Sequence, residues 1–293
     1  MPLATVDAAS GVAAASGVQQ LWMPPIPLSD APRIFVVDNF ATQAECDEIF
    51  RTAEPHLEQS LTQGKDGQSD KNPIGRRSRQ YTLSPHRWTP SITSVIDRMD
   101  ATSMQPLENG QHLTITDYGN EDKYELHVDS SFAVGRTATA LLFLEAPTEG
   151  GELVFPWARA ALSNPRFGPA REPPRPPGVF GAGRPVEETF TFTSVPSLES
   201  LGACNDTSDN AALRIRPQVG RLVVFFNHDP MGRTLRPRSL HGSCPVREGR
   251  KRIAQRWYQW HALHSENRLG SLLEQVEKAN GKTWFVDWRS AEA

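Results

Sequence analysis

Three side chains in this sequence have the types and spacing of a metal site. His127 and Asp129 stand two positions apart in a segment that reads as a β-strand. Because alternate residues of a strand point to the same face, both side chains share one face, about 6 to 7 Å apart along the strand. His241, far along the chain, is the third candidate. Two imidazoles and one carboxylate on one face of a metal leave open positions for a co-substrate and O2, as in non-haem Fe(II) oxygenases.

Short motifs of this kind also occur by chance, and other histidines compete for the third position. His228 is the rival, but it stands where a strand breaks into a loop with proline and glycine. Three further histidines read as structural or exposed: His112, His261 and His264. His241 is favoured over His228 because a cation, Lys251, follows it at a useful distance.

Lys251 and Tyr118 carry groups suited to an acidic co-substrate. We place the turn of a hairpin at residues 247–249. Lys251 then faces Pro245 across the hairpin. Pro245 lies an even number of residues after His241 and therefore points to the same face of the strand. The lysine and the histidine thus both point inward. Their offset along the strand is about 13 Å. A small dicarboxylate that chelates iron at one end and pairs with the ammonium at the other fits this gap, and Tyr118 adds a hydroxyl donor.

The composition favours a soluble protein with no general affinity for polyanions. The net charge of −3 gives no attraction to nucleic acid or to an anionic membrane. Three scattered cysteines, Cys46, Cys204 and Cys244, form neither a disulfide framework nor a zinc motif, so reduced thiols are expected. The first basic residue is Arg33, and no apolar run approaches the roughly 20 residues of a membrane span. We therefore expect a cytoplasmic protein without a signal peptide.

The chain reads as one domain after a lead-in rich in small residues and proline. Residues 1–30 are expected to be disordered or loosely packed, and residues 31–293 to form a single domain. Within this domain, residues 31–110 are expected to give helical and strand support and residues 111–260 the core. Residues 261–293 are expected to form a C-terminal helix and tail.

From residue 111 the pattern has period two, with short strands between turns, which favours an all-β core with flanking helices. A capping box at Thr42–Glu45 and an apolar stripe within Ser91–Asp100 predict two of these helices. Residues 157–213 form a long irregular insertion, which we read as a passive or disordered loop in preference to a lid. The arginines of residues 76–79 read as part of a solvated loop.

A series of motifs runs in order through about two thirds of the chain: Arg33-Ile-Phe-Val-Val-Asp-Asn-Phe40, Glu45-Cys-Asp47, Tyr118-Gly119, Tyr124-x-x-His-x-Asp129, Arg136-Thr-Ala-Thr139, Gly150-Gly-Glu152, Pro217-x-x-Gly220, His241-Gly-Ser-Cys-Pro-Val-x-x-Gly-x-Lys251 and Trp257. In this series the sequence resembles the prolyl 4-hydroxylase branch of the Fe(II)- and 2-oxoglutarate-dependent dioxygenases. The resemblance implies a double-stranded β-helix, a jelly-roll fold of the cupin type.

The resemblance also implies roles for particular residues. His127, Asp129 and His241 would be the catalytic ligands of Fe(II), and Tyr118 and Lys251 would hold the distal carboxylate of 2-oxoglutarate. The implied reaction hydroxylates a peptidyl proline while 2-oxoglutarate is decarboxylated to succinate and CO2, with ascorbate as a further cofactor. The implied partner is a peptide or protein substrate with a proline-rich sequence, with no nucleic acid or membrane involved, and the enzyme is a monomer or homodimer.

Three departures from the family pattern leave the substrate open. Gly-Gly-Glu is usually followed by Thr in the family, where this chain has Leu153; the loop between Asp129 and Thr137 is very short; and the 157–213 insertion is long. A free amino acid or another metabolite is therefore an alternative substrate, because a fold does not fix a substrate. A non-catalytic jelly-roll binding module is the third alternative, although such a module has no reason to keep two histidines, an aspartate and a lysine at these spacings.

Overall fold

The computed structural model describes residues 24–63, 69–70, 75–130, 135–160, 195–205, 212–228 and 236–259. The predictions for the lead-in up to residue 23, for most of the 157–213 insertion and for the C-terminal helix lie outside these residues, as do His261 and His264. The five predicted site residues all lie within the described part.

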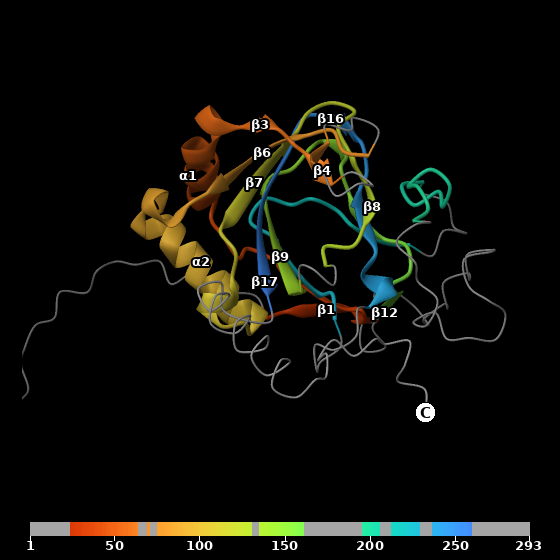
Figure 1. Ribbon diagram of the computed structural model, residues 1–293, viewed down its shortest axis with the longest axis horizontal. Coiled ribbons are helices and arrows are strands. Elements are labelled where there is room, and N and C mark those ends of the chain that lie inside the picture. Colours follow the sequence, from red (N-terminus) through yellow and green to blue (C-terminus); the bar gives the residue numbers. More distant parts are fainter. Residues whose placement is uncertain are drawn as a thin grey trace, which may run out of the picture.

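Two α-helices and a set of antiparallel strands make up the described chain (Figure 1). The helices are α1 (Gln43–Ala53) and α2 (Pro90–Ser103), with 3₁₀ turns at Glu54–His56, Pro85–Arg87, Leu107–Asn109 and Pro237–Ser239. The large sheet contains, in spatial order, β12 (Arg159–Ala160), β1 (Ile26–Ala31), β2 (Arg33–Val37), β14 (Leu222–Phe226), β9 (Arg136–Glu145), β17 (Lys251–Gln259), β7 (Leu113–Tyr118), β6 (Arg79–Leu83) and β3 (Glu58–Gln59). The small sheet contains β13 (Leu213–Ile215), β11 (Leu153–Phe155), β15 (His241–Ser243) and β8 (Tyr124–His127). Two short pairs complete the set: β10 (Glu149–Gly150) with β16 (Val246–Glu248), and β4 (Thr62–Gln63) with β5 (Ser69–Asp70).

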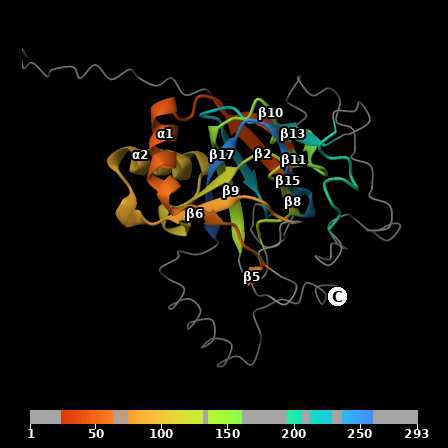
Figure 2. The same cartoon turned by 90° about the horizontal axis from the view of Figure 1, so that it is seen from above.

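The large and small sheets face each other, and α1 and α2 cover the other face of the large sheet (Figures 1 and 2). Phe143 and Ile253 of the large sheet pack in one cluster with Phe155 and Ile215 of the small sheet. A second cluster joins the large sheet to the two helices. The prediction of an all-β jelly-roll core with flanking helices is therefore confirmed.

Strand β9 is apolar along most of its length because both of its faces are covered. Leu141 and Phe143 point into the space between the sheets. Ala140, Leu142 and Leu144 point to the helices. A strand that is buried on both faces reads as a continuous hydrophobic run and lacks the polar alternation of a half-exposed strand.

The two helices form where the sequence predicts them. The side chain of Thr42 accepts a hydrogen bond from the backbone N–H of Glu45, and the Glu45 carboxylate accepts one from the backbone N–H of Thr42. This capping box satisfies backbone donors that would otherwise be unpaired at the start of α1. The buried faces contain Cys46, Ile49, Phe50 and Ala53 of α1 and Ile92, Val95, Ile96 and Met99 of α2. Neither of these helices, nor any other in the described chain, has the length and apolar content that crossing a membrane requires.

The ordered sheet begins earlier than the predicted lead-in allows. Strand β1 starts at Ile26, within the segment 1–30 that was expected to be disordered or loosely packed. It pairs with β2 on one side and β12 on the other, and Leu28 is buried in the cluster between the sheets. The small residues and prolines of residues 1–30 indicate disorder, but Pro27 stands at a register shift, where a sheet accepts proline.

The predicted hairpin around residues 247–249 is wrong. Strand β15 pairs with β8 and β11 in the small sheet, whereas β17 pairs with β7 and β9 in the large sheet. Between them, β16 pairs with β10, so the chain crosses from one sheet to the other. The turn residues Arg247-Glu-Gly249 indicate that the chain reverses, but they do not determine which strands then pair.

A buried ion pair joins α2 to the large sheet. Arg256 donates through Nε to Asp100 Oδ1 at 2.6 Å and through Nη2 to Asp100 Oδ2 at 3.1 Å, and the Tyr258 hydroxyl donates to Oδ1 at 2.8 Å. The same guanidinium also donates to the carbonyl oxygen of Leu107. A β-carbon at Gly110 would lie 2.3 Å from Arg256 Nη2, so only glycine leaves room for the arginine. This network fixes how the helix sits on the sheet.

A disulfide bond joins Cys204 to Cys244, so the expectation of reduced thiols is wrong for this pair. The bond links the segment 195–205, which lies in the predicted insertion, to the residue that follows β15. Around it is an outer cluster that covers the small sheet on the side away from the large sheet, formed by Leu126, Val154, Trp157, Leu198, Ala203, Leu240 and Cys244. The disulfide therefore holds a cover over a sheet that includes both β8 and β15.

We expect Cys204→Ser to lower the free energy of unfolding by about 2 to 4 kcal/mol, because the cross-link closes a long loop and restricts the unfolded chain. Chemical denaturation of the two proteins measures the difference. Wild-type protein with a reducing agent is the matched control and should unfold as the variant does. Equal stability of wild type and variant under oxidising conditions would contradict this account of the bond.

Candidate metal centre

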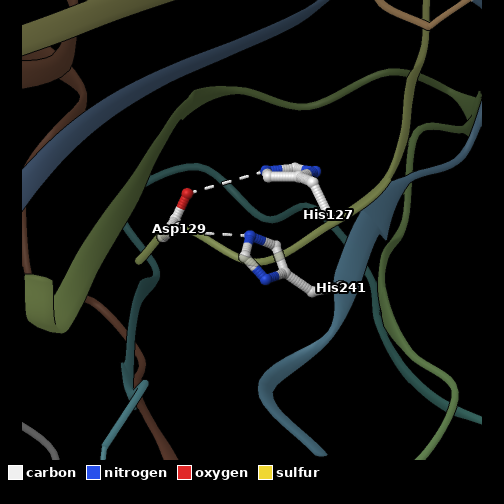
Figure 3. A group of neighbouring side chains, drawn as sticks. All are labelled: His127, Asp129 and His241. Carbon is white, nitrogen blue, oxygen red and sulfur yellow. Dashed lines mark ion pairs between the residues drawn. The ribbon is translucent and has the colours of Figure 1, made fainter. Parts of the chain in front are cut away.

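The register of two strands in the small sheet brings His127 and His241 together. His127 is the last residue of β8 and His241 the first of β15, and these two residues are directly paired across the antiparallel ladder. Paired residues of an antiparallel sheet point to the same face. Asp129 follows β8 by two positions and completes the group shown in Figure 3. The predicted trio is thus in one place.

The three side chains approach one another closely enough to share one ion. His127 Nε2 lies 3.6 Å from Asp129 Oδ1, and His241 Nε2 lies 3.6 Å from Asp129 Oδ2 (Figure 3). One ligand atom from each residue lies within 4.8 Å of those from the other two. This is the only such group of histidine, cysteine and acidic residues in the described chain.

Both imidazoles are held with Nε2 directed at the aspartate. His127 Nδ1 lies 2.8 Å from the carbonyl oxygen of Glu125, and His241 Nδ1 lies 2.8 Å from that of Ser239. A carbonyl oxygen only accepts, so each Nδ1 carries the proton and each Nε2 presents its lone pair. Such hydrogen bonds are the usual way in which proteins fix the tautomer of a metal-binding histidine.

The charges of the group also suit a cation. Burial lowers the pKa of His241 to about 4, so this imidazole is neutral and able to bind a metal at physiological pH. Burial alone would raise the pKa of Asp129, but its polar and charged neighbours, Arg136 among them, hold it below its usual value. The carboxylate is therefore ionised, and the donor set fits Fe(II) as a facial triad.

Aromatic side chains surround the group on the protein side. Tyr124 stacks on His127 with ring centroids 3.7 Å apart. Phe225 and Phe155 lie beside His241, with centroids at 4.7 and 5.4 Å. These rings restrict the movement of both imidazoles and lower the dielectric constant around the site, which strengthens the attraction between the carboxylate and a cation.

Lys251 and Tyr118 lie together between the sheets, although not by way of the predicted hairpin. They are directly paired across β17 and β7, and Lys251 Nζ lies 5.1 Å from the centre of the Tyr118 ring. Lys251 is 1% exposed, and its ammonium donates to Ser243 Oγ at 2.6 Å. Burial lowers the pKa of Lys251 to about 7 and raises that of Tyr118 to about 12. The phenol therefore keeps its proton and remains a hydrogen-bond donor.

Some residues differ from what their sequence context suggested. Arg76 belongs to the run that was read as a solvated loop, yet it is buried and its guanidinium lies 4.5 Å from the centre of the Tyr124 ring. Arg77 is exposed, as that reading expects. His228, the rival third ligand, is outside the group, and its Nε2 lies 2.7 Å from Ser130 Oγ. His112 lies edge-on to Trp88, away from the group.

Three polar residues near the site were given no role from the sequence: Ser243, Thr139 and Asn227. Thr139 ends the motif Arg136-Thr-Ala-Thr139, and its hydroxyl stands in the otherwise apolar run of β9; these two signals could have identified it. Ser243 follows His241 by two positions and therefore points to the same face, a relation that the β15 register makes visible.

A jelly roll with two histidines and one aspartate on its inner face defines the class of non-haem iron oxygenases. The sequence of residues 113–259, which is half of the chain, matches the 2OG-Fe(II) oxygenase superfamily. The chain belongs to this superfamily, whose members use Fe(II) and 2-oxoglutarate. The predictions of a dioxygenase and of these two cofactors are confirmed, and ascorbate remains a prediction.

Prolyl 4-hydroxylases are among the curated proteins that resemble the chain. Prolyl 4-hydroxylase 2 of Arabidopsis thaliana is 29% identical over 240 residues, which are 78% of this chain and 68% of that protein. Probable prolyl 4-hydroxylase 10 of the same plant is 27% identical over 242 residues, 80% of this chain and 71% of that protein. The resemblance drawn from the motifs is thereby confirmed.

Two solved structures of similar proteins are also prolyl hydroxylases. The viral collagen prolyl hydroxylase of Paramecium Bursaria Chlorella virus-1, in its 2-oxoglutarate complex, has a TM-score of 0.46 and 21% identity, covering 78% of this chain and 97% of that one. A prolyl-4-hydroxylase of Pseudomonas putida has a TM-score of 0.45 and 13% identity, covering 78% of this chain and 93% of that one.

We expect His241→Ala to weaken Fe(II) or Mn(II) binding by more than the roughly 10- to 100-fold that loss of an outer-shell partner costs, because it removes a ligand atom itself. Anaerobic calorimetric titration measures the affinity. His86→Ala, at an exposed histidine on the protein surface, is the matched control and should bind the metal as wild type does. Equal metal affinity of the His241 variant and wild type would exclude this site.

Proposed function

We propose that this protein is an Fe(II)- and 2-oxoglutarate-dependent hydroxylase of peptidyl proline, in which His127, Asp129 and His241 hold the iron. The observation that carries the proposal is the convergence of these three side chains on the inner face of a jelly roll. The similar curated proteins are named prolyl 4-hydroxylases, which supports the choice of proline. When bound, the iron and its co-substrate supply oxygen activation and the oxidative decarboxylation that yields succinate and CO2.

Lys251 and Tyr118 are proposed to hold the distal carboxylate of 2-oxoglutarate. A buried ammonium is costly without a counter-ion, and a carboxylate would supply one. Ser243 already accepts a hydrogen bond from Lys251, which aims the ammonium, and the Tyr118 hydroxyl can donate to the same anion. The protein thus contributes orientation and a low-dielectric pocket floor.

A peptide substrate is supported by unpaired polar atoms on Arg136 and on its neighbours Trp257 and Gln259. Arg136 donates to the backbone oxygen of Asp129 at 3.2 Å and lies 4.1 Å from the centre of the Trp257 ring. Three buried atoms have no hydrogen-bond partner among the described residues. They are the donors Arg136 Nε and Trp257 Nε1 and the acceptor Gln259 Oε1. A peptide backbone carries donors and acceptors in alternation and could satisfy such a set. A proline-rich sequence for this peptide is part of the proposal.

The alternatives make different predictions. A free amino acid or another metabolite would use the same iron and co-substrate but no extended chain. The non-catalytic binding module would need neither the iron nor the co-substrate.

The oligomeric state, monomer or homodimer, stays a prediction. So does the cytoplasmic location, and the disulfide weighs against it because disulfides persist mainly in oxidising compartments.

The decisive assay supplies Fe(II), 2-oxoglutarate, ascorbate and a panel of proline-rich peptides. We expect succinate release to rise with peptide, and mass spectrometry to find one added oxygen on a proline. His241→Ala is the inactive control. Succinate release stimulated by a metabolite and by none of the peptides would replace the prolyl claim with the metabolite alternative.

The affinity for 2-oxoglutarate should fall as pH rises above 7. The pKa of Lys251 is lowered to about 7 by burial, so above this pH the free protein holds the neutral amine, and binding the carboxylate must take up a proton. The dissociation constant should then rise by up to about tenfold per pH unit. Calorimetry of the metal-loaded protein, in buffers of different ionisation enthalpy, measures the affinity and the proton uptake together.

Lys251→Met is the matched control for this pH dependence. We expect it to weaken 2-oxoglutarate binding about 10- to 100-fold, the cost of losing a charged hydrogen bond, and to remove the dependence between pH 7 and 9. A wild-type affinity that stays constant over this range, with no proton uptake, would contradict the role of the lysine.

A further inference from the structure

A buried chain of hydrogen bonds stands behind Asp129. The Thr139 hydroxyl donates to Asp129 Oδ2 at 2.7 Å, and Asn227 Nδ2 donates to Thr139 Oγ1 at 3.3 Å. Thr139 and Asn227 are both 0% exposed. Neither residue belongs to the proposed ligand set, so this series of hydrogen bonds needs an explanation of its own.

The backbone holds Thr139 and Asn227 in place. Thr139 lies on the inner face of β9, directly paired with Phe225 of β14. Asn227 follows β14, its backbone N–H donates to the carbonyl oxygen of Thr137 at 2.8 Å, and its own carbonyl oxygen accepts from the N–H of Arg236 at 2.7 Å. The two side chains are therefore fixed by the ladder and by the bonds at its end.

The direction of the hydrogen bonds follows from the chemistry of the groups. A carboxylate only accepts, so the single hydrogen of the Thr139 hydroxyl must go to Asp129. The hydroxyl oxygen can then only accept from Asn227, and the amide must present its nitrogen. As a result, Asn227 Oδ1 is buried with no hydrogen bond from the rest of the described chain. Leaving a buried acceptor unpaired destabilises the fold, which indicates that the orientation serves Asp129.

The consequence for Asp129 is that its two oxygens are no longer equivalent. Oδ2 accepts the Thr139 hydrogen bond and lies 3.6 Å from His241 Nε2, whereas Oδ1 lies 3.6 Å from His127 Nε2 and takes no part in this series of hydrogen bonds. A facial triad works because three single-atom ligands leave positions for the co-substrate and O2. A carboxylate that bound through both oxygens would fill one of those positions.

We propose that Thr139 and Asn227 are positioning residues that keep Asp129 a one-oxygen ligand and so preserve the position that O2 needs. This inference rests on the proposed function and extends it to two residues. Asn227 acts through Thr139 by fixing the direction of its hydroxyl, and Thr139 acts on the metal through Asp129.

The test uses two readouts that do not depend on turnover. Anaerobic titration gives the metal affinity. Electron paramagnetic resonance of the Fe(II)·2-oxoglutarate protein with nitric oxide, a stand-in for O2, reports whether a position remains open. Thr139→Val, which keeps the shape and removes the hydroxyl, is expected to weaken metal binding about 10- to 100-fold and to lose the nitric oxide signal when metal is saturating.

Two further variants separate positioning from packing. Thr139→Ser restores the hydroxyl and should recover both the affinity and the signal. Asn227→Asp presents a second acceptor to the same hydroxyl and should behave as Thr139→Val does. Thermal unfolding of each variant identifies any that fails to fold. If Thr139→Val does not fold, the comparison of Thr139→Ser with Asn227→Asp decides the question.

The outcomes are distinguishable from failure of the proposed function. If Thr139→Val binds metal and nitric oxide as wild type does, while His241→Ala loses the metal, the positioning role is overturned and the iron site stands. If His241→Ala keeps the metal, the proposed function itself fails.

Discussion

The pairing of His127 with His241 across β8 and β15 is the constraint on which the rest of the structure depends. A shift of one residue in this register would turn one imidazole to the outer face of the small sheet. The ladder alone does not prevent such a shift, because β15 has three residues and β8 has four. Other parts of the molecule must therefore stabilise the pairing, and they do so on both faces of the small sheet.

On the inner face, the cluster between the sheets packs against His241 through Phe155 and Phe225. On the outer face, the outer cluster and the Cys204–Cys244 disulfide hold residues 195–205 against β8 and β15. Gly242, between the two inward residues of β15, is close to Leu198 and to the backbone of Tyr124, and a β-carbon there would lie 3.0 Å from each. The short strand is thus fixed by close packing and a covalent bond as well as by its ladder.

The large sheet supplies the other half of the pocket. Lys251 and Tyr118 come from β17 and β7, and the Asp100–Arg256 ion pair fixes the same β17 to α2 on the opposite face. The strand that carries the proposed co-substrate lysine is therefore held from behind. The metal ligands and the lysine lie on opposing sheets, and the distance between the sheets sets the length of the molecule that can join them.

The sequence was sufficient for features that depend on local periodicity. The capping box predicts the start of α1, and the two-residue spacing of His127 and Asp129 predicts that their side chains lie close together, which they do although β8 ends at His127. It was insufficient wherever distant pairing decides the outcome. The turn after β15 looked like a hairpin because turn residues do not specify partners, and Cys204 carried no local sign of its bond to Cys244. Strand β1 was missed because the small residues and prolines of residues 1–30 indicate a disordered lead-in, whereas the sheet accepts Pro27 at a register shift. The proposed role of Asn227 could not be predicted from the sequence, because it depends on a hydrogen bond to Thr139 that directs the Thr139 hydroxyl to Asp129.

The central claim is that one ferrous ion is bound by His127, Asp129 and His241. Crystals grown anaerobically with Fe(II) and 2-oxoglutarate, measured at the iron absorption edge, test it directly. The account predicts a single strong anomalous peak within about 2.3 Å of both Nε2 atoms and of one oxygen of Asp129, the bonding range of nitrogen and oxygen ligands. A peak elsewhere, or an ion at this position that His241 does not contact, would contradict it.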